Sequence, residues 1–269
     1  MPEIKANATT LNYRWDGPAE GPVVMLAHSL GAHLGMWDWQ VPALTEAGYR
    51  VLRYDSRGHG ASAAPERSYT MEMLADDAVG LLDALALDRV HFLGLSLGGM
   101  VGQVLAAAHK DRLFSLILSS TSAHMPPPEM WEERMQAVSV DGTAAVVDGT
   151  LDRWITPAGQ RRQPEAVERV RAMILGTPTE GFIGCCTAIR DLDQRDANRS
   201  ITVPTLILVG EQDQGTPPAM ARAIHECIPG ARLEVVPGAA HLVNVEQADL
   251  FNRTIVAFLD QQRPAPADR

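Results

Sequence analysis

The stretch Val90-His91-Phe92-Leu93-Gly94-Leu95-Ser96-Leu97-Gly98-Gly99 decides the fold. It begins as an apolar run typical of a buried strand, and residues 98–109 follow with helical spacing. A Gly-x-Ser-x-Gly turn between a strand and a helix is the pattern of a nucleophile elbow, in which a Cβ at either flanking position would clash. We therefore expect Ser96 to raise its hydroxyl above the sheet, at a helix N-terminus that favours a developing anion. The pattern alone leaves open a glycine-rich turn with an incidental serine.

Short apolar runs and longer helical segments alternate on both sides of this turn. The runs at residues 23–27, 51–54, 90–94, 113–118, 205–209 and 233–236 predict strands, and residues 71–85, 98–109, 219–228 and 250–259 predict helices. Runs that are apolar throughout indicate strands buried on both faces, as in parallel sheets under helices. The alternation predicts an α/β fold with a mostly parallel central sheet flanked by helices.

The alternation stops between residues 122 and 199, where the chain becomes helix-like and residues 165–175 predict the clearest helix. A chain of 269 residues fits one α/β domain. We therefore predict a core of residues 1–121 and 200–269, with residues 122–199 inserted as a helical lid. The proline-containing tail, residues 263–269, is expected to fray.

Composition excludes several classes of function. The formal net charge is −10 and no Lys/Arg-rich run occurs, which argues against nucleic acid and anionic membranes as partners. The three cysteines, Cys185, Cys186 and Cys227, are an odd number, so reduced thiols are a simpler reading than a disulfide framework. Without a recognisable signal peptide or a long apolar run, a cytoplasmic protein is expected. The oligomeric state is left open.

A serine hydroxyl needs a base to take its proton. His241 follows the predicted strand 233–236 in Pro-Gly-Ala-Ala-His, on a loop at the carboxyl edge of the sheet, where such folds collect their chemistry. The acid that orients it should lie between the serine and the histidine in sequence. Asp213, in the loop after strand 205–209, is preferred. Glu211 is the nearest alternative, and Asp191 and Asp193 are disfavoured because they lie in the insertion.

Acyl transfer also needs amide donors for an oxyanion. The Leu97 N–H, directly after the serine, is one, and the Leu30 N–H in His-Ser-Leu-Gly after strand 23–27 is the best second donor. We interpret His28 as structural, and residues 55–62 as a loop that braces the Leu30 loop. A metal role for His59 and Asp55 is not supported by ligand spacing.

These motifs occur in the order found in the α/β-hydrolase superfamily, which the chain resembles over nearly its whole length. His-Ser-Leu-Gly at 28–31, Arg-Tyr-Asp-Ser-Arg-Gly-His-Gly at 53–60 and Met-Trp-x-x-Arg at 130–134 are most similar to the 3-oxoadipate enol-lactonases. Trp154 and residues 186–191 also resemble the lid of that group, whereas the Cys185-Cys186 pair departs from it.

The resemblance implies hydrolysis of a five-membered enol-lactone that bears an acetate arm, giving 3-oxoadipate, a late step in bacterial breakdown of aromatic acids. Ser96, His241 and Asp213 would form the catalytic triad, and no cofactor or metal would be needed. Arg134 would meet the substrate carboxylate, with Trp131 and Trp154 as apolar walls. A solvated Arg134 and tryptophans that serve only as lid core are an equal alternative.

Other functions remain open at this point. The same elbow fits a general carboxylesterase or a cofactor-free perhydrolase, and a carbon–carbon bond hydrolase is a weaker option. Dehalogenases and epoxide hydrolases place an aspartate at the elbow, where this chain has Ser96. A non-catalytic ligand receptor on the same fold is the rival from another class, and the complete set of triad residues argues against it.

Overall fold

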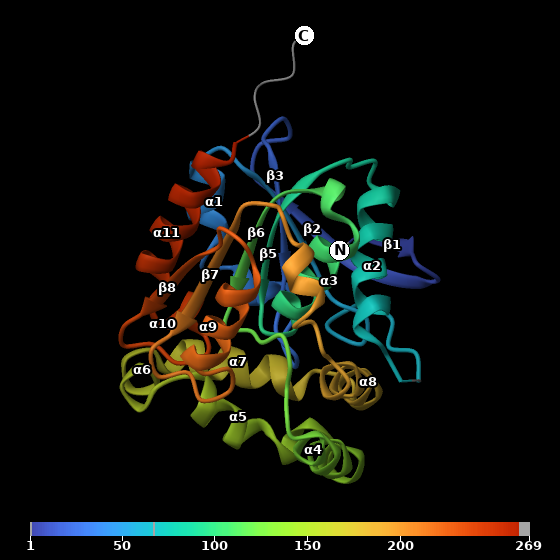
Figure 1. Cartoon of the computed structure of the whole chain (residues 1–269). Helices are drawn as coiled ribbons and strands as arrows, with labels where there is room; N and C mark the ends of the chain where they lie inside the picture. Colours follow the sequence, from blue (N-terminus) through green and yellow to red (C-terminus); the bar gives the residue numbers. More distant parts are fainter. Residues whose placement is uncertain (1, 67, 264–269) are drawn as a thin grey trace.

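A sheet of eight strands forms the centre of the computed structural model, which describes residues 2–66 and 68–263 (Figure 1). The strands are β1 (Glu3–Ala6), β2 (Thr9–Asp16), β3 (Val23–Ala27), β4 (Arg50–Tyr54), β5 (Val90–Leu95), β6 (Leu113–Ser119), β7 (Thr205–Gly210) and β8 (Arg232–Val236). Their order in the sheet is β1-β2-β4-β3-β5-β6-β7-β8. Strands β3 to β8 are parallel, so the predicted mostly parallel sheet is confirmed.

The six predicted strands are present, each within one residue of its predicted bounds. Every residue of β3, β5 and β7 is buried, which explains why these strands read as uninterrupted apolar runs. Strands β1 and β2 were not among the predicted strands, and they pair antiparallel at one edge of the sheet. Polar side chains such as Asn12 and Arg14 interrupt β2, so this half-exposed strand lacks the continuous apolar run of the central strands.

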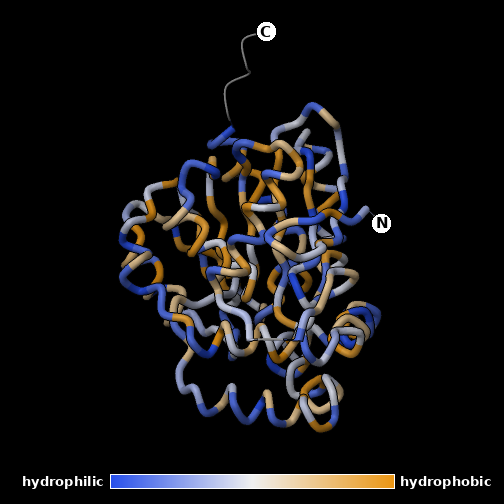
Figure 2. The backbone as a smooth tube through the Cα atoms, turned by 90° about the vertical axis from the view of Figure 1, so that its right-hand side faces the viewer, coloured by the Kyte–Doolittle hydropathy of each residue, from blue (hydrophilic) through white to orange (hydrophobic). Residues whose placement is uncertain are grey.

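Helices cover both faces of the sheet (Figure 1). One hydrophobic cluster includes side chains of α2 (Met71–Ala84), α3 (Leu97–Ala108) and α9 (Pro218–Cys227). The other includes side chains of α1 (Val41–Glu46), the short α10 (Val243–Glu246) and α11 (Ala248–Gln261). In Figure 2 the hydrophobic segments gather in the body of the molecule around the sheet.

Residues 122–199 form helices that lie below the carboxyl ends of the strands in Figure 1. They are α4 (Pro128–Asp141), α5 (Val147–Trp154), α6 (Pro157–Arg162), α7 (Pro164–Leu175) and α8 (Thr179–Arg190), with 3₁₀ turns at Gly142–Ala145 and Ala197–Ser200. Three of these helices carry a proline in their first turn, where its missing N–H costs nothing. We call residues 122–199 the lid segment. Its division from the core remains a prediction.

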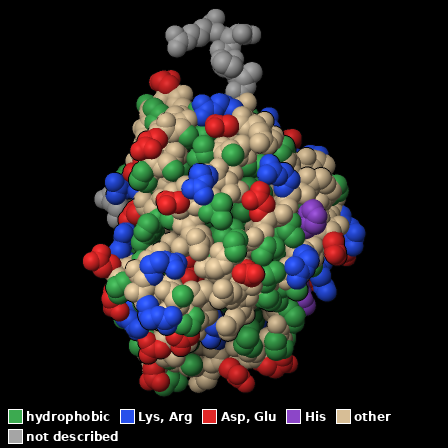
Figure 3. Space-filling view, turned by 90° about the vertical axis from the view of Figure 1, so that its left-hand side faces the viewer, with side chains coloured by type: hydrophobic (Ala, Val, Ile, Leu, Met, Phe, Trp, Pro, Cys, Tyr) green, Lys and Arg blue, Asp and Glu red, His purple; other side chains and the backbone are tan. Residues whose placement is uncertain are grey.

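The remaining short elements are the 3₁₀ turns Leu34–Trp37 and Lys110–Arg112. Of the predicted tail, residues 264–269 lie outside the described residues. Within the described chain no single helix is long and apolar enough to cross a bilayer, and α7 with α8 meets that requirement only as a pair bent by 93°. On the face shown in Figure 3, acidic and basic side chains are interspersed.

Candidate active site

The turn at Ser96 has the tight geometry predicted for it. Ser96 joins β5 to α3 with φ 56° and ψ −113°, a backbone conformation that costs a residue with a side chain about 1–3 kcal/mol. A Cβ on Gly94 would lie 2.1 Å from the Gly98 carbonyl oxygen, and one on Gly98 would lie 2.1 Å from that of Ala27. Glycine is therefore required on both sides of Ser96, and the serine side chain projects from the carboxyl edge of the sheet.

His241 and Asp213 lie in the loops after β8 and β7. The Nδ1 of His241 is 2.9 Å from Oδ2 of Asp213, and both side chains are almost wholly buried. The other carboxylate oxygen, Oδ1, accepts hydrogen bonds from the Gly215 and Thr216 amides, at 2.8 and 2.9 Å. The Thr216 hydroxyl donates to Oδ2 at 2.9 Å. Burial alone would raise the pKa of Asp213, but His241 and the Thr216 donors outweigh it and lower that pKa.

The alternative acids have other partners. Glu211 is exposed and accepts a long hydrogen bond of 3.4 Å from the Gly238 amide. Asp191 pairs with Arg190, and Asp193 pairs with Arg195, in both cases at the surface. The geometry therefore favours Asp213 as the carboxylate that contacts His241.

A cavity of about 330 Å³ connects the elbow with the lid segment. It is lined by six of the residues singled out from the sequence, namely Leu30, Ser96, Trp131, Arg134, Trp154 and His241. Asp213 lies behind His241, and Leu97 is the buried first residue of α3. Met130 and Ile189, from the two lid stretches that resemble the enol-lactonases, also line it. The remaining lining residues were not predicted from the sequence and are Met100, Met125, Glu133, Val146, Arg153, Gln214, Gly215 and Thr216.

The loop that carries Leu30 is held by the segment predicted to brace it. The Gly31 amide donates to Nε2 of His59 at 2.9 Å, and the Leu34 amide donates to Oδ1 of Asp55 at 2.7 Å. The Gly98 amide donates to the His28 carbonyl oxygen at 3.1 Å, which ties the elbow to the same loop. These bonds fix the backbone beside both predicted oxyanion donors.

His28 and His59 are structural in this arrangement. The Nε2 of His28 accepts from the Ser56 amide at 2.9 Å, as Nε2 of His59 accepts from Gly31, so each ring carries its proton on Nδ1. Burial lowers the pKa of His28 to about 4 and that of His59 to about 3. Both rings therefore stay neutral at physiological pH, and the interpretation of His28 as structural agrees with its contacts.

The lid segment is joined to the His241 loop. The Leu242 amide donates to the Trp154 carbonyl oxygen at 2.9 Å, and the Trp154 and His241 rings stack with centroids 5.6 Å apart. The buried carboxylate of Glu246 accepts from the Ala240 amide at 2.7 Å and from the Thr156 hydroxyl at 2.6 Å. Because Glu246 bonds to both segments, the position of His241 and that of the Trp154 wall depend on each other.

Arg134 reaches from α4 toward α5. Its Nη2 donates to the Thr150 hydroxyl at 2.8 Å, and its guanidinium lies 5.6 Å from the ring centroids of both Trp131 and Phe182. Burial lowers the pKa of Arg134 below its ordinary value. Within the described chain, Nε of Arg134 and Nε1 of Trp131 are buried without a hydrogen-bond partner. Arg134 also lines the cavity, where its guanidinium offers a cation to an acceptor-rich group such as a carboxylate.

Comparison with known proteins gives the family. The family model described as "Serine aminopeptidase, S33" matches residues 19–248, which is most of the chain. This chain is an α/β-hydrolase of that family. The hydrolase is 34% identical to 3-oxoadipate enol-lactonase 2 of Acinetobacter baylyi over 95% of both chains.

Solved structures agree with that assignment. The hydrolase is similar to the enol-lactonase from Burkholderia xenovorans LB400, with 40% identity and a TM-score of 0.94 over 96% of this chain and 100% of the other. It is also similar to a thermophilic esterase from Thermogutta terrifontis, solved with malate bound, with 30% identity and a TM-score of 0.92 over 98% and 100% of the two chains.

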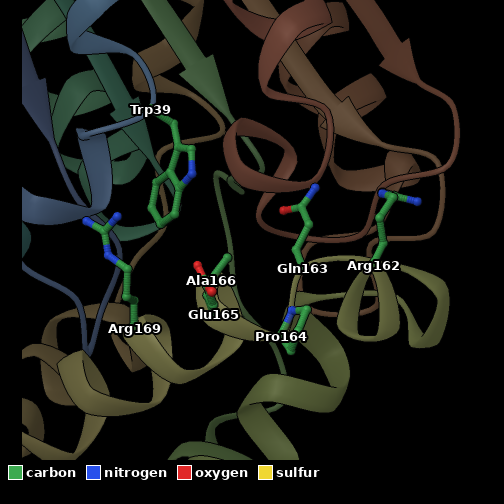
Figure 4. A pocket seen from close by; sticks show the side chains of 7 residues that line it. All are labelled: Trp39, Arg162, Gln163, Pro164, Glu165, Ala166 and Arg169. Carbon is green, nitrogen blue, oxygen red and sulfur yellow. The ribbon is translucent and has the colours of Figure 1, made fainter.

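Two further features of the hydrolase bear on its chemistry. Among residues 2–66 and 68–263, no group of three or more His, Cys, Asp or Glu side chains is arranged to hold a metal ion. A second hollow, of about 400 Å³, lies beside Trp39 at the junction of α6 and α7, with Arg162 and Arg169 at its rim (Figure 4). It contains none of the predicted catalytic residues, so the cavity at Ser96 is the candidate active site.

Proposed function

We propose that this α/β-hydrolase opens a small carboxylated enol-lactone, 3-oxoadipate enol-lactone, to 3-oxoadipate. The observation that carries the proposal is a single cavity in which Ser96 and His241 face a wall of Trp131, Trp154 and Arg134. That wall offers apolar surface for a ring and a cation for a carboxylate. The enol-lactonases among its relatives support the same substrate class.

The first half of the proposed reaction forms an acyl-enzyme. Ser96 attacks the lactone carbonyl carbon while its proton passes to Nε2 of His241, and Asp213 holds Nδ1–H and stabilises the imidazolium. The Leu30 and Leu97 amides receive the oxyanion. When the tetrahedral intermediate collapses, the ring carbon–oxygen bond breaks and the ring oxygen leaves as an enolate. His241 returns the proton that it took from Ser96 to the enolate, and protonation at carbon gives the ketone and leaves the imidazole neutral.

The second half releases the product. With the imidazole neutral again, His241 takes a proton from water, and the resulting hydroxide attacks the ester carbon of the acylated Ser96. Collapse of this second intermediate expels the serine oxygen, which recovers its proton from His241. The acid that leaves is 3-oxoadipate. His241 carries the protons that Ser96 and the attacking water lose, so the proposed reaction needs no cofactor.

Recognition of the substrate carboxylate is assigned to Arg134. The protein carries a formal net charge of −10, so an anionic substrate needs a local cation to offset the field. The esterase relative from Thermogutta terrifontis was solved with a dicarboxylate, malate, bound, which is in keeping with a carboxylate ligand. We further propose that residues 122–199 act as the lid and that the small-molecule lactone, rather than nucleic acid or membrane, is the partner.

The cellular setting is part of the same proposal. Cys185, Cys186 and Cys227 are free thiols, which supports a reducing compartment such as the cytoplasm. Enol-lactone hydrolysis belongs to the breakdown of aromatic acids, so we place the protein in that type of catabolism.

A general carboxylesterase is the second candidate, favoured by the similarity to the Thermogutta esterase. The test is kcat/KM for 3-oxoadipate enol-lactone beside p-nitrophenyl acetate. Preference for the lactone by several orders of magnitude supports the proposal. A preference for the simple ester would replace the lactonase with an esterase, and formation of a peracid when peroxide is added would indicate a perhydrolase.

A further inference from the structure

We propose that Arg153 forms, together with Arg134, a two-guanidinium subsite that binds the carboxylate of the substrate. The inference deepens the proposed function and rests on it for the identity of the substrate. It concerns a residue that no sequence motif singled out. The subsite would take a small aliphatic carboxylate attached to the lactone or ester that Ser96 attacks.

The two guanidiniums approach the same turn of one helix. Arg134 comes from α4 and donates from Nη2 to Thr150 Oγ1 at 2.8 Å. Arg153 lies on α5 and folds back over Gly149, where an added Cβ would be 3.4 Å from its Nη1. Gly149 and Thr150 are neighbours in sequence, so both guanidiniums lie beside the same turn of α5. Both side chains also line the cavity that contains Ser96 and His241.

Neither arginine has a carboxylate partner within the described chain. The ion pairs of residues 2–66 and 68–263 include neither Arg134 nor Arg153. Glu133 also lines the cavity, but it is exposed and pairs with neither of them. The nearby positive charge of Arg153 adds to burial in lowering the pKa of Arg134, so the two cations repel each other. A bound carboxylate would relieve this repulsion.

The chemistry of the pair selects the ligand. Each guanidinium presents several N–H donors in a planar fork that matches two carboxylate oxygens. A single carboxylate supplies four lone-pair sites, enough to accept from both forks. A neutral ester would leave the repulsion between the cations in place.

The test compares Arg153→Met with Arg161→Met, a control that removes the same charge from an exposed residue of α6 outside the cavity. The readout is the ratio of kcat/KM for 3-oxoadipate enol-lactone to that for p-nitrophenyl acetate. We expect Arg153→Met to lower this ratio about ten- to a hundredfold, mainly through KM of the lactone, the effect of one charge-assisted hydrogen bond. We expect Arg161→Met to keep the wild-type ratio.

A second readout does not depend on the lactone being the substrate. Adipate, a saturated dicarboxylate, should inhibit p-nitrophenyl acetate hydrolysis competitively, and its inhibition constant should rise about ten- to a hundredfold in Arg153→Met and less in Arg153→Lys. Equal inhibition of wild type and Arg153→Met, or no inhibition of the wild type, would overturn the subsite. Failure to hydrolyse the lactone while adipate inhibition depends on Arg153 would overturn the proposed substrate but keep the subsite.

Discussion

Replacing Asp213 by asparagine tests the proposed orientation of the general base. Oδ1 of the new amide can still accept from the Gly215 and Thr216 amides, so the loop keeps those bonds. The amide NH₂ then faces Nδ1 of His241 at the place where Oδ2 now lies, 2.9 Å away. A donor at that place favours the imidazole tautomer with its proton on Nε2, which cannot accept the serine proton.

The expected loss follows from that tautomer change and from the missing charge beside the imidazolium. We expect kcat for p-nitrophenyl acetate to fall by about two to four orders of magnitude, or about 3–5 kcal/mol of transition-state stabilisation. Asp213→Ala should fall in the same range. Steady-state kinetics gives kcat, and thermal unfolding of both variants shows whether they are folded.

Glu211→Gln is the matched control, because it changes a carboxylate two residues earlier in the same loop. Within the described residues its side chain accepts one hydrogen bond, the long one from the Gly238 amide, and makes no hydrogen bond or ion pair with His241. We expect its kcat to stay within about threefold of the wild type. Near-normal kcat in folded Asp213→Asn, or an equal loss in Glu211→Gln, would refute Asp213 as the acid of the triad.

Three further changes test the structural account by urea unfolding. Glu246→Gln turns an amide NH₂, which cannot accept a hydrogen bond, toward either the Ala240 N–H or the Thr156 donors. We expect the free energy of unfolding to fall by about 2 kcal/mol, and an unchanged value would contradict the role of this carboxylate. Folding lowers the pKa of His28 to about 4 and that of His59 to about 3. Between about pH 6.5 and pH 4 the unfolded chain therefore binds more protons than the folded chain, and the free energy of unfolding falls as the pH falls. From pH 7 to pH 5 we expect a loss of about 2 kcal/mol for each histidine, and equal stability at both values would be inconsistent with neutral buried rings. Gly98→Ala places a Cβ 2.1 Å from a backbone oxygen and should cost about 3 kcal/mol, whereas a stable variant would mean that the elbow is less tight than described.

Much of the site could be predicted because each loop that carries a proposed catalytic residue follows a strand, and each of those strands is recognisable in the sequence as an apolar run. Parallel strands place their carboxyl ends at one edge of the sheet, so the loops with Ser96, Asp213 and His241 had to meet there. The Gly-x-Ser-x-Gly spacing also required the positive φ of the serine. The assignment of Asp213 over Glu211 rested on its place in the loop, and its contacts with Thr216 and His241 agree with it.

Other features depend on contacts between segments far apart in sequence. Thr216, Glu246 and Arg153 carry no motif, and their relevance appears only when the loops and the lid helices lie against one another. Glu246 illustrates this, because its two partners, Ala240 and Thr156, come from different parts of the chain. Strands β1 and β2 were not predicted for a different reason, because half-exposed antiparallel strands lack a continuous apolar run.

The central claim is that Ser96 in this cavity opens a carboxylated enol-lactone. The most direct test is kcat/KM of wild type and Ser96→Ala for 3-oxoadipate enol-lactone, each measured beside p-nitrophenyl acetate. The account predicts a lactone preference of several orders of magnitude in the wild type, and a loss of about four orders or more with both substrates in the variant. Lactone turnover that survives in folded Ser96→Ala, or is no faster than that of the simple ester in the wild type, would contradict it.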